Sequence, residues 1–259
     1  MESIDFNSQK MADILYDAYL HNKQIAKELI PAFLKKDDAY KLQHMLTAKK
    51  AVEADEQLAG YKISLTSPET QKLFGSETPL YGALTTSALS GGTVSLEAMS
   101  SPLIEIELIF LIKEGLSVED DVQTILEKTL VAPGIEVPDS RFEDWFPKIT
   151  LGQVIADSAV AGKIIAGKPV EGLTYEQLTD LKGTLRFNGE EIASANSSAV
   201  LDHPVNAVKW LITELEGHGL KLEKGMSVSS GTFILPHKLE KGVYTASYEG
   251  IGEVTLNVI

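Results

Sequence analysis

The sequence predicts an α+β fold in which a mixed β-sheet curls over itself and helices lie on its outside. Helical periodicity dominates residues 8–54, whereas alternating apolar patterns dominate after Gly60. Further helices interrupt the later strands at irregular intervals. A regular alternation of strand and helix would instead predict a doubly wound parallel sheet, so the irregular spacing argues against that architecture.

The N-terminal region predicts two helices. Behind a Ser8 cap, apolar residues recur at helical spacing; these are Met11, Ile14, Leu15, Ala18 and Tyr19. A second helix follows Pro31, with Asp37 or Asp38 as its cap. We therefore expect a helical region over residues 1–59 and a region built on β-structure over residues 60–259.

Alternating apolar residues predict the strands. They occur at 61–66, 103–112, 226–234, 243–248 and 253–258. The dipeptide Asn188-Gly189 separates two further short strands. Because both central positions of a two-residue hairpin turn need positive φ, this dipeptide predicts a hairpin.

Capping patterns predict three later helices. Ser117 and Thr174 each stand three residues before an acidic or amide side chain, as in a capping box. Asp202 precedes an apolar stripe, with Pro204 in the first turn and Gly217 as the stop signal.

Composition excludes several functional classes. The 259 residues include 23 basic and 37 acidic side chains, a net charge of −14, with 44% apolar residues and no cysteine. Without cysteine, disulfides, thiolate metal sites and thiol nucleophiles are excluded. The acidic balance argues against nucleic-acid binding, which needs a basic face. We find no signal peptide and no apolar run of membrane length, and expect a cytoplasmic protein with no membrane partner.

The stretch 103–112 places two carboxylates among aliphatic residues. With a period of two, Glu105 and Glu107 share one face with Leu103, Ile109 and Leu111, and the opposite face is wholly apolar. Unpaired charges there would cost several kcal/mol or take up protons, so something must compensate them. A hard divalent cation is the first candidate. The alternative is a strand rim where both carboxylates pair with lysines.

A second stretch, 133–145, contains a candidate third ligand. Glu136 lies between aliphatic residues after a turn at Gly134, and Arg141, one of only two arginines, follows five positions later. Three carboxylates around Mg²⁺ would leave coordination positions for water and a chelating substrate. The alternative is that Asp139-Ser140-Arg141 forms a turn with a local ion pair.

A third stretch, 60–67, places Lys62, Ser64 and Thr66 on one face of a strand. Because most lysines are solvated, Lys62 taken alone is expected at the surface. His203, just before Pro204, is more typical of a helix start than of a metal ligand.

Taken together and in this order, these stretches resemble the 2-keto-4-pentenoate hydratase and 4-oxalocrotonate decarboxylase family of the fumarylacetoacetate hydrolase superfamily. The resemblance covers nearly the whole chain. It rests on residues 39–43, 60–67, 77–82, 104–107, 134–141, 203–204 and 250–254.

The resemblance implies a β-roll catalytic domain over residues 60–259, preceded by a small helical layer. It implies Mg²⁺ or Mn²⁺ held by Glu105, Glu107 and Glu136, and Lys62 as a catalytic residue facing a bound 2-oxo acid. It also implies a homo-oligomer. The implied substrate-binding residues are Leu80, Ser140, Arg141 and Asp157.

The implied activity is a metal-dependent lyase reaction on a small unsaturated 2-oxo acid. The first candidate is the 2-keto-4-pentenoate (2-hydroxypenta-2,4-dienoate) hydratase type, as in meta-cleavage catabolism of aromatic compounds. Leu80 stands where hydratases carry Asp, and together with Asp139 it favours a 4-oxalocrotonate-type decarboxylase as the alternative. Departures from the family pattern at 156–160 and 229–232 leave a different oxo acid open. An acylpyruvate-type C–C hydrolase and a non-catalytic ligand-binding relative are further alternatives.

Overall fold

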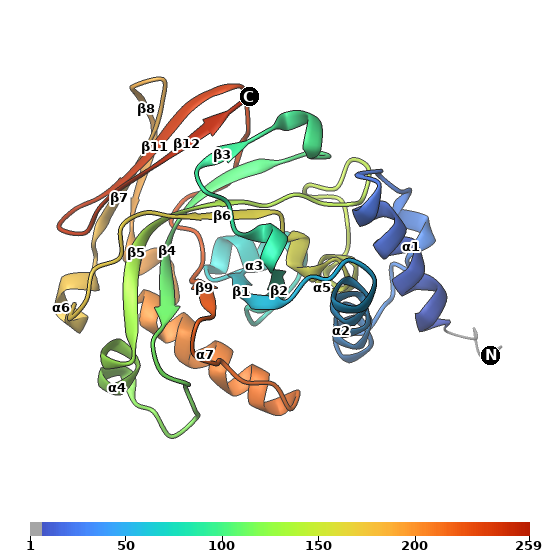
Figure 1. The fold of residues 1–259 in the computed structure, drawn as a ribbon, viewed down its shortest axis with the longest axis horizontal. Helices are drawn as coiled ribbons and strands as arrows, with labels where there is room; N and C mark the ends of the chain where they lie inside the picture. Colours follow the sequence, from blue (N-terminus) through green and yellow to red (C-terminus); the bar gives the residue numbers. More distant parts are fainter. Residues whose placement is uncertain (1–6) are drawn as a thin grey trace.

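The computed structural model describes residues 7–259, which form two β-sheets flanked by helices (Figure 1). The helices α1–α7 span Ser8–Leu20, Lys36–Glu53, Pro68–Phe74, Val122–Glu127, Leu151–Ala156, Tyr175–Leu178 and Pro204–Gly217. The strands β1–β12 span Leu58–Ser64, Leu80–Thr85, Thr93–Val94, Leu103–Ile112, Thr129–Val137, Lys163–Ala166, Lys182–Phe187, Glu190–Asn196, Ser227–Ser229, His237–Lys238, Gly242–Tyr248 and Gly252–Val258. The predicted α+β class is confirmed.

The larger sheet has the strand order β2-β1-β9-β4-β5-β6, with β10 also paired to β4. Strands β1 and β9 run parallel, whereas β4 is antiparallel to both β5 and β9, so the sheet is mixed as predicted. The second sheet has the order β3-β12-β11-β7-β8. Strands β11 and β12 contact β5, and Tyr248 donates a hydrogen bond to the Gly134 carbonyl at 2.5 Å, which joins the two sheets. The long strands β4 and β5 of the larger sheet curve along their length (Figure 1).

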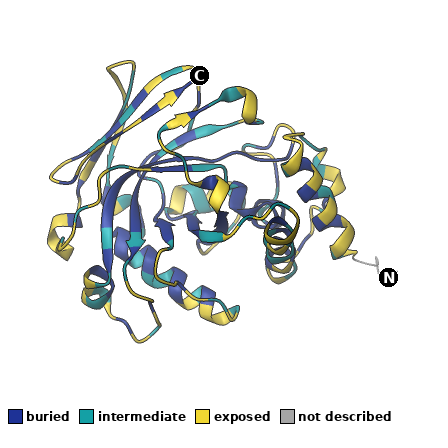
Figure 2. Cartoon of the chain, viewed as in Figure 1, coloured by how far each residue is buried: buried dark blue, intermediate teal, exposed yellow. Residues whose placement is uncertain are grey.

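The helices cover the outer sides of the larger sheet. Helices α4 and α7 contact each other beyond one end of β4 and β5, whereas α1, α2 and α5 form a layer on the other side (Figure 1). Most buried apolar residues of α1 and α2 belong to the same apolar core as the strands, and the exposed residues lie on the outer faces of these helices (Figure 2). None of the helices in residues 7–259 is both long and apolar enough to cross a membrane.

The predicted N-terminal helices form, but their caps were wrong. Asn7, not Ser8, caps α1 by accepting a first-turn backbone N–H at 2.9 Å. Helix α2 begins behind Lys35 with no side-chain cap. Asp37 and Asp38 instead lie in its first turn, where carboxylates interact favourably with the helix dipole.

The later helix starts were predicted with mixed success. Thr174 caps α6 in a capping box, as predicted. Helix α4 begins behind Asp121 rather than at Ser117. The cap of α7 is His203 rather than Asp202, because the imidazole Nδ1 accepts from a first-turn N–H at 3.1 Å.

Strand β4 matches its predicted span, and the hairpin at Asn188-Gly189 is confirmed by φ angles of 50° and 90°. The first predicted strand ends early because Leu65 has a φ of 57°. The region 226–234 contributes only β9, Ser227–Ser229.

Gly134 was predicted in a turn, and this was wrong because it lies inside β5. It is opposite Glu107 in the β4–β5 register. A Cβ at this position would lie 2.5 Å from Ile109 Cγ1 and 2.8 Å from the Glu107 carbonyl oxygen. The glycine therefore allows β5 to approach the strand that carries the two glutamates.

We predict that Gly134→Ala lowers the free energy of unfolding by about 1–3 kcal/mol, because the added methyl group overpacks a rigid contact. Gly91→Ala is the matched control, since no atom lies within 4 Å of a Cβ built there. It should change stability by less than about 1 kcal/mol. Urea denaturation of both variants measures this, and equal effects would contradict the packing role of Gly134.

Candidate metal centre

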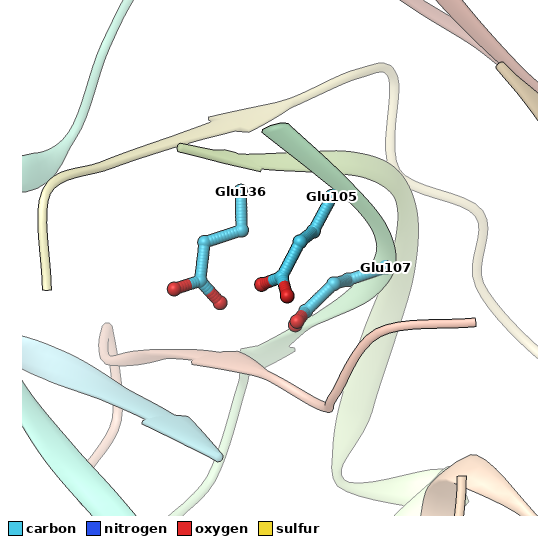
Figure 3. A group of neighbouring side chains, drawn as sticks. All are labelled: Glu105, Glu107 and Glu136. Atoms are coloured by element: carbon cyan, nitrogen blue, oxygen red, sulfur yellow. The ribbon is translucent and has the colours of Figure 1, made fainter. Parts of the chain in front are cut away.

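Two antiparallel strands bring the three predicted carboxylates together. Glu105 and Glu107 point from the same face of β4, and Glu105 is directly opposite Glu136 of β5. The side chains converge on one point (Figure 3), and one carboxylate oxygen from each lies within 4.8 Å of the others. Three oxygen ligands at this separation can hold a hard cation.

The three glutamates lie in a largely buried position, and neighbouring positive charge balances only part of their negative charge. Glu107 and Glu136 are each 1% exposed. Burial raises the pKa of Glu105 to about 8, with Glu136 adding to this shift and Lys62 opposing it. Burial, followed by the charges of Glu136 and Glu105, raises the pKa of Glu107 well above its usual value. The group therefore favours either protons or a cation.

Hydrogen bonds orient only one of the three carboxylates. Glu107 Oε2 accepts from Ser229 Oγ at 2.5 Å and from the Gly231 backbone N–H at 2.9 Å. Glu136 Oε1 contacts the Lys62 ammonium at 2.8 Å, whereas Oε2 has no hydrogen-bond partner among the described residues. Because buried polar atoms are normally partnered, the donor set and Glu136 Oε2 fit a bound divalent cation.

Lys62 of β1 supplies an ammonium to the site and is only 2% exposed, so the expectation of a surface position was wrong. Its Nζ lies 2.8 Å from Glu136 Oε1 and donates to Ser64 Oγ at 2.6 Å and the Ala159 carbonyl at 3.2 Å. Burial alone would lower the pKa of Lys62, but the three glutamates raise it. The amine is thus held charged beside the carboxylates.

The alternative of a strand rim with lysine pairs describes the site only in part. One lysine pairs with Glu136, and Glu105 is half-buried. Three negative charges against one positive charge leave an excess of two, which equals the charge of a divalent cation.

A cavity of about 60 Å³ opens beside Lys62, Glu105 and Glu107. Helix α3 forms one wall; it starts at a Ser67 capping box with Pro68 in the first turn and ends at Gly75 with a φ of 61°. Leu73 and Phe74 of this helix line the cavity, and the remaining walls are mainly apolar and include Leu65, Trp145, Phe146, Val154 and Val160. Ser64, Thr70 and Thr232 supply the few hydroxyl groups. The charged cluster therefore faces an apolar chamber, which is the usual composition of a small-molecule site.

A left-handed turn forms the support for Lys62. Ser158, Ala159 and Val160 have φ angles of 53°, 51° and 53°, a conformation that is uncommon for residues other than glycine. A Cβ on Gly82 would lie 1.9 Å from the Ser158 carbonyl oxygen, so this glycine lets β2 pack against the turn. Strain of this kind persists only where surrounding contacts fix it.

Arg141 and Asp157, which do not line this cavity, hold that turn through hydrogen bonds. Arg141 donates to Asp157 Oδ1 at 2.5 Å, to the Asp157 carbonyl at 2.7 Å and to the Ala161 carbonyl at 2.7 Å. Ser140 Oγ donates to Asp157 Oδ2 at 2.9 Å. Asp139 instead accepts from two backbone N–H groups, so the alternative of a local ion pair within 139–141 was wrong.

The four predicted substrate contacts lie around the cavity but not in its lining. Ser140, Arg141 and Asp157 form the network behind the turn. Leu80 of β2 is buried and pairs across the sheet with Ser64, which does line the cavity. Their contact with substrate stays a prediction.

The sequence predicted no role for Ser229, which donates a hydrogen bond to Glu107, or for Thr232, which lines the cavity. From the sequence, residues 229–232 are distinguished only as a departure from the family pattern. Ser229 is opposite Ile109 in the β4–β9 register, two residues from Glu107, and this long-range pairing cannot be inferred from local sequence patterns.

Known proteins resemble this chain over most of its length. No family model matches the chain. It is 33% identical over 222 residues to a 2-keto-4-pentenoate hydratase of Paraburkholderia phymatum, with 83% of both chains covered. It is 30% identical over 236 residues to a 4-oxalocrotonate decarboxylase of Pseudomonas putida, covering 86% and 85% of the two chains. The chain belongs to this hydratase and decarboxylase family.

A solved family structure has the same architecture. The 4-oxalocrotonate decarboxylase from Pseudomonas putida G7, complexed with magnesium and adipate, superposes with a TM-score of 0.88 at 27% identity over 100% of this chain and 99% of that chain. A fumarylpyruvate hydrolase from Pseudomonas aeruginosa, in complex with Mn²⁺ and pyruvate, matches with a TM-score of 0.58 at 15% identity over 77% and 88%. At that identity the second comparison supports the superfamily fold alone.

We predict that Arg141→Met lowers the free energy of unfolding by about 3–5 kcal/mol, because Asp157 would remain buried without its partner. The other arginine provides the control. Arg186 lies 3.8 Å from Glu191 in an exposed pair, so Arg186→Met should cost less than about 1 kcal/mol. Chemical denaturation compares the two, and similar losses would contradict the buried role of Arg141.

Proposed function

We propose that this protein is a Mg²⁺-dependent lyase that adds water to a small unsaturated 2-oxo acid, as a 2-keto-4-pentenoate hydratase does. The observation that carries this proposal is the convergence of three carboxylates, two buried and one half-buried, beside a charged lysine at an apolar cavity. Family membership supports it, because relatives named as hydratases match this chain at about 30% identity.

Glu105, Glu107 and Glu136 would hold the cation, and the oxygen donor set favours Mg²⁺ or Mn²⁺. When bound, the ion would act as a Lewis acid toward the keto and carboxylate oxygens of the substrate. Ser229 and the Gly231 backbone orient Glu107 through their hydrogen bonds. Such partners of ligating groups fix the ligand geometry.

Lys62 would transfer a proton to and from the substrate. Its Nζ donates to Ser64 Oγ and the Ala159 carbonyl and lies 2.8 Å from Glu136 Oε1, so the hydrogen that faces Glu136 would become available to a substrate atom when a cation binds that carboxylate. A positioned ammonium can donate a proton to the substrate carbon during ketonisation, and the resulting amine can take one back. The charge of Lys62 also attracts an anionic substrate.

The apolar walls would hold the carbon chain of the substrate. Phe74, Trp145 and Phe146 lie around the cavity, with the rings of Trp145 and Phe146 centred 5.3 Å apart. Exclusion of bulk water from such a chamber strengthens the electrostatic interactions within it.

We propose that Arg141, Asp157 and Ser140 serve substrate binding through the left-handed turn at 158–160. Their hydrogen bonds hold the turn whose Ala159 carbonyl accepts from Lys62. Leu80 would act beside Ser64, its cross-strand partner, at the edge of the cavity.

A decarboxylase of the 4-oxalocrotonate type is the second candidate. The observation that favours it is the superposition over the whole chain on such an enzyme, with a TM-score of 0.88. A C–C hydrolase has less support, because no histidine is present among the residues that line the cavity in the described part of the chain. A non-catalytic relative would not retain metal binding at the glutamates. A homo-oligomer remains our proposal for the assembly, to be measured by light scattering.

We predict that the protein with Mg²⁺ hydrates 2-hydroxypenta-2,4-dienoate and that EDTA abolishes this activity. Glu107→Gln should lower kcat/KM on the order of 100-fold or more, because it removes a ligand rather than a supporting contact. Glu119→Gln, at an exposed position, should have no effect. Product analysis by NMR, with 4-oxalocrotonate as the second substrate, measures this.

Release of CO₂ from 4-oxalocrotonate without hydration of the dienoate would replace the hydratase with the decarboxylase. Turnover of neither compound, or full activity in EDTA, would contradict the proposed lyase.

A further inference from the structure

A second cavity, of about 90 Å³, lies between the ends of α1 and α2 and strand β6. It shares no lining residue with the cavity beside the glutamates. Its volume is several times the roughly 10–15 Å³ that one water molecule needs. The cavity therefore has room for a small polyatomic ligand.

Lys50, near the end of α2, is the unusual side chain of this cavity. It is 7% exposed and lines the cavity, yet its ammonium has no hydrogen bond or ion pair with any residue among 7–259. Its Nζ lies 3.6 Å from the centre of the Tyr19 ring, which covers one side of the charge. A buried charge is normally paired, so this ammonium has three donors to offer a ligand.

The other lining groups also offer positive charge and N–H donors. Arg141 uses three of its five N–H donors on Asp157 and Ala161, and Lys163 uses one of its three on the Ser87 carbonyl. The lining thus contains three cationic side chains, Lys50, Arg141 and Lys163.

The nearby carboxylates are already engaged. Asp139, the one carboxylate in the lining, accepts from the Ser100 and Ser101 backbone N–H groups at 2.9 and 2.7 Å. Glu56, which lies outside the lining, accepts from the Tyr19 and Ser87 hydroxyls. Neither contacts Lys50 within ion-pair distance among the described residues.

We propose that this cavity binds a small oxyanion, either a carboxylate or inorganic phosphate, with Lys50 as its main charge partner. The ammonium of Lys50 would face the oxyanion directly, and the remaining N–H donors of Arg141 and Lys163 would bind its other oxygens.

The protonation behaviour of Lys50 is consistent with an anion site. Burial lowers its pKa to about 7, the charges of Arg141 and Lys163 act in the same direction, and Glu56 and Asp157 oppose them. An anion bound at Nζ would favour the charged form and reverse part of this shift. Contact with the Tyr19 ring alone leaves the ammonium without a hydrogen-bond acceptor.

Residues that are adjacent in the chain line the two cavities. Pro138 and Val160 line the first cavity, whereas their neighbours Asp139 and Ala161 line the second. Arg141 contacts the second cavity and also holds the turn that supports Lys62. An anion in the second cavity would therefore contact Arg141, which also holds the turn beside the first cavity.

Thermal unfolding and calorimetric titration of the metal-free protein test the proposal. Sodium phosphate and sodium acetate are titrated separately, with sodium chloride at equal ionic strength as the reference. We expect at least one oxyanion to raise Tm above the chloride reference and to give a saturable heat. Whether phosphate or acetate binds more tightly identifies the class of ligand.

Lys50→Met should weaken that binding at least tenfold, whereas Lys50→Arg should retain most of it. Lys182→Met, which removes one charge from an exposed position, should bind as the wild type does. Anion binding at Lys62 would persist in Lys50→Met, so full binding by that variant overturns the proposal. A wild-type response equal to that in chloride overturns it without any variant.

Discussion

The convergence of three carboxylates on one ammonium, in a largely buried position, is the constraint on which the site depends. Glu105, Glu107 and Glu136 meet because β4 and β5 pair in one register, and Gly134 lets the two strands approach closely. Such a cluster is unfavourable in a dry interior unless cations balance it. Lys62 balances one charge, and a divalent ion would balance the other two. The apolar walls maintain the low dielectric environment that makes this balance matter.

A second set of contacts joins the charged cluster to the surrounding loops. The ammonium of Lys62 is held by the carbonyl of Ala159, which stands in a left-handed turn of three residues. That turn is fixed by the buried pair of Arg141 and Asp157. Residues that do not line the first cavity thus hold the turn that contacts Lys62, and one of them, Arg141, lines the cavity around Lys50.

Local patterns predicted much of the site. The alternation in 103–112 placed Glu105 and Glu107 together on one face because the side-chain period of a strand is fixed. The aliphatic neighbours of Glu136 indicated a candidate third ligand, and the family resemblance placed Lys62 at the site. Sequence did not reveal the opposition of Glu105 and Glu136, since it arises from strand register across 31 positions. The same holds for Arg141 and Asp157, and for the lone ammonium of Lys50, whose surroundings come from several elements. Caps shifted by one residue, as at Asn7 and His203, because neighbouring polar residues compete for the same N–H groups.

The most direct test of the metal centre is a crystal structure of the protein soaked in Mn²⁺, with diffraction data collected at the manganese absorption edge. We predict an anomalous peak at coordination distance from Glu105, Glu107 and Glu136, and its loss in Glu107→Gln crystals treated in the same way. Saturating Mn²⁺ without a peak between these carboxylates, or a peak that survives in the variant, would contradict the account.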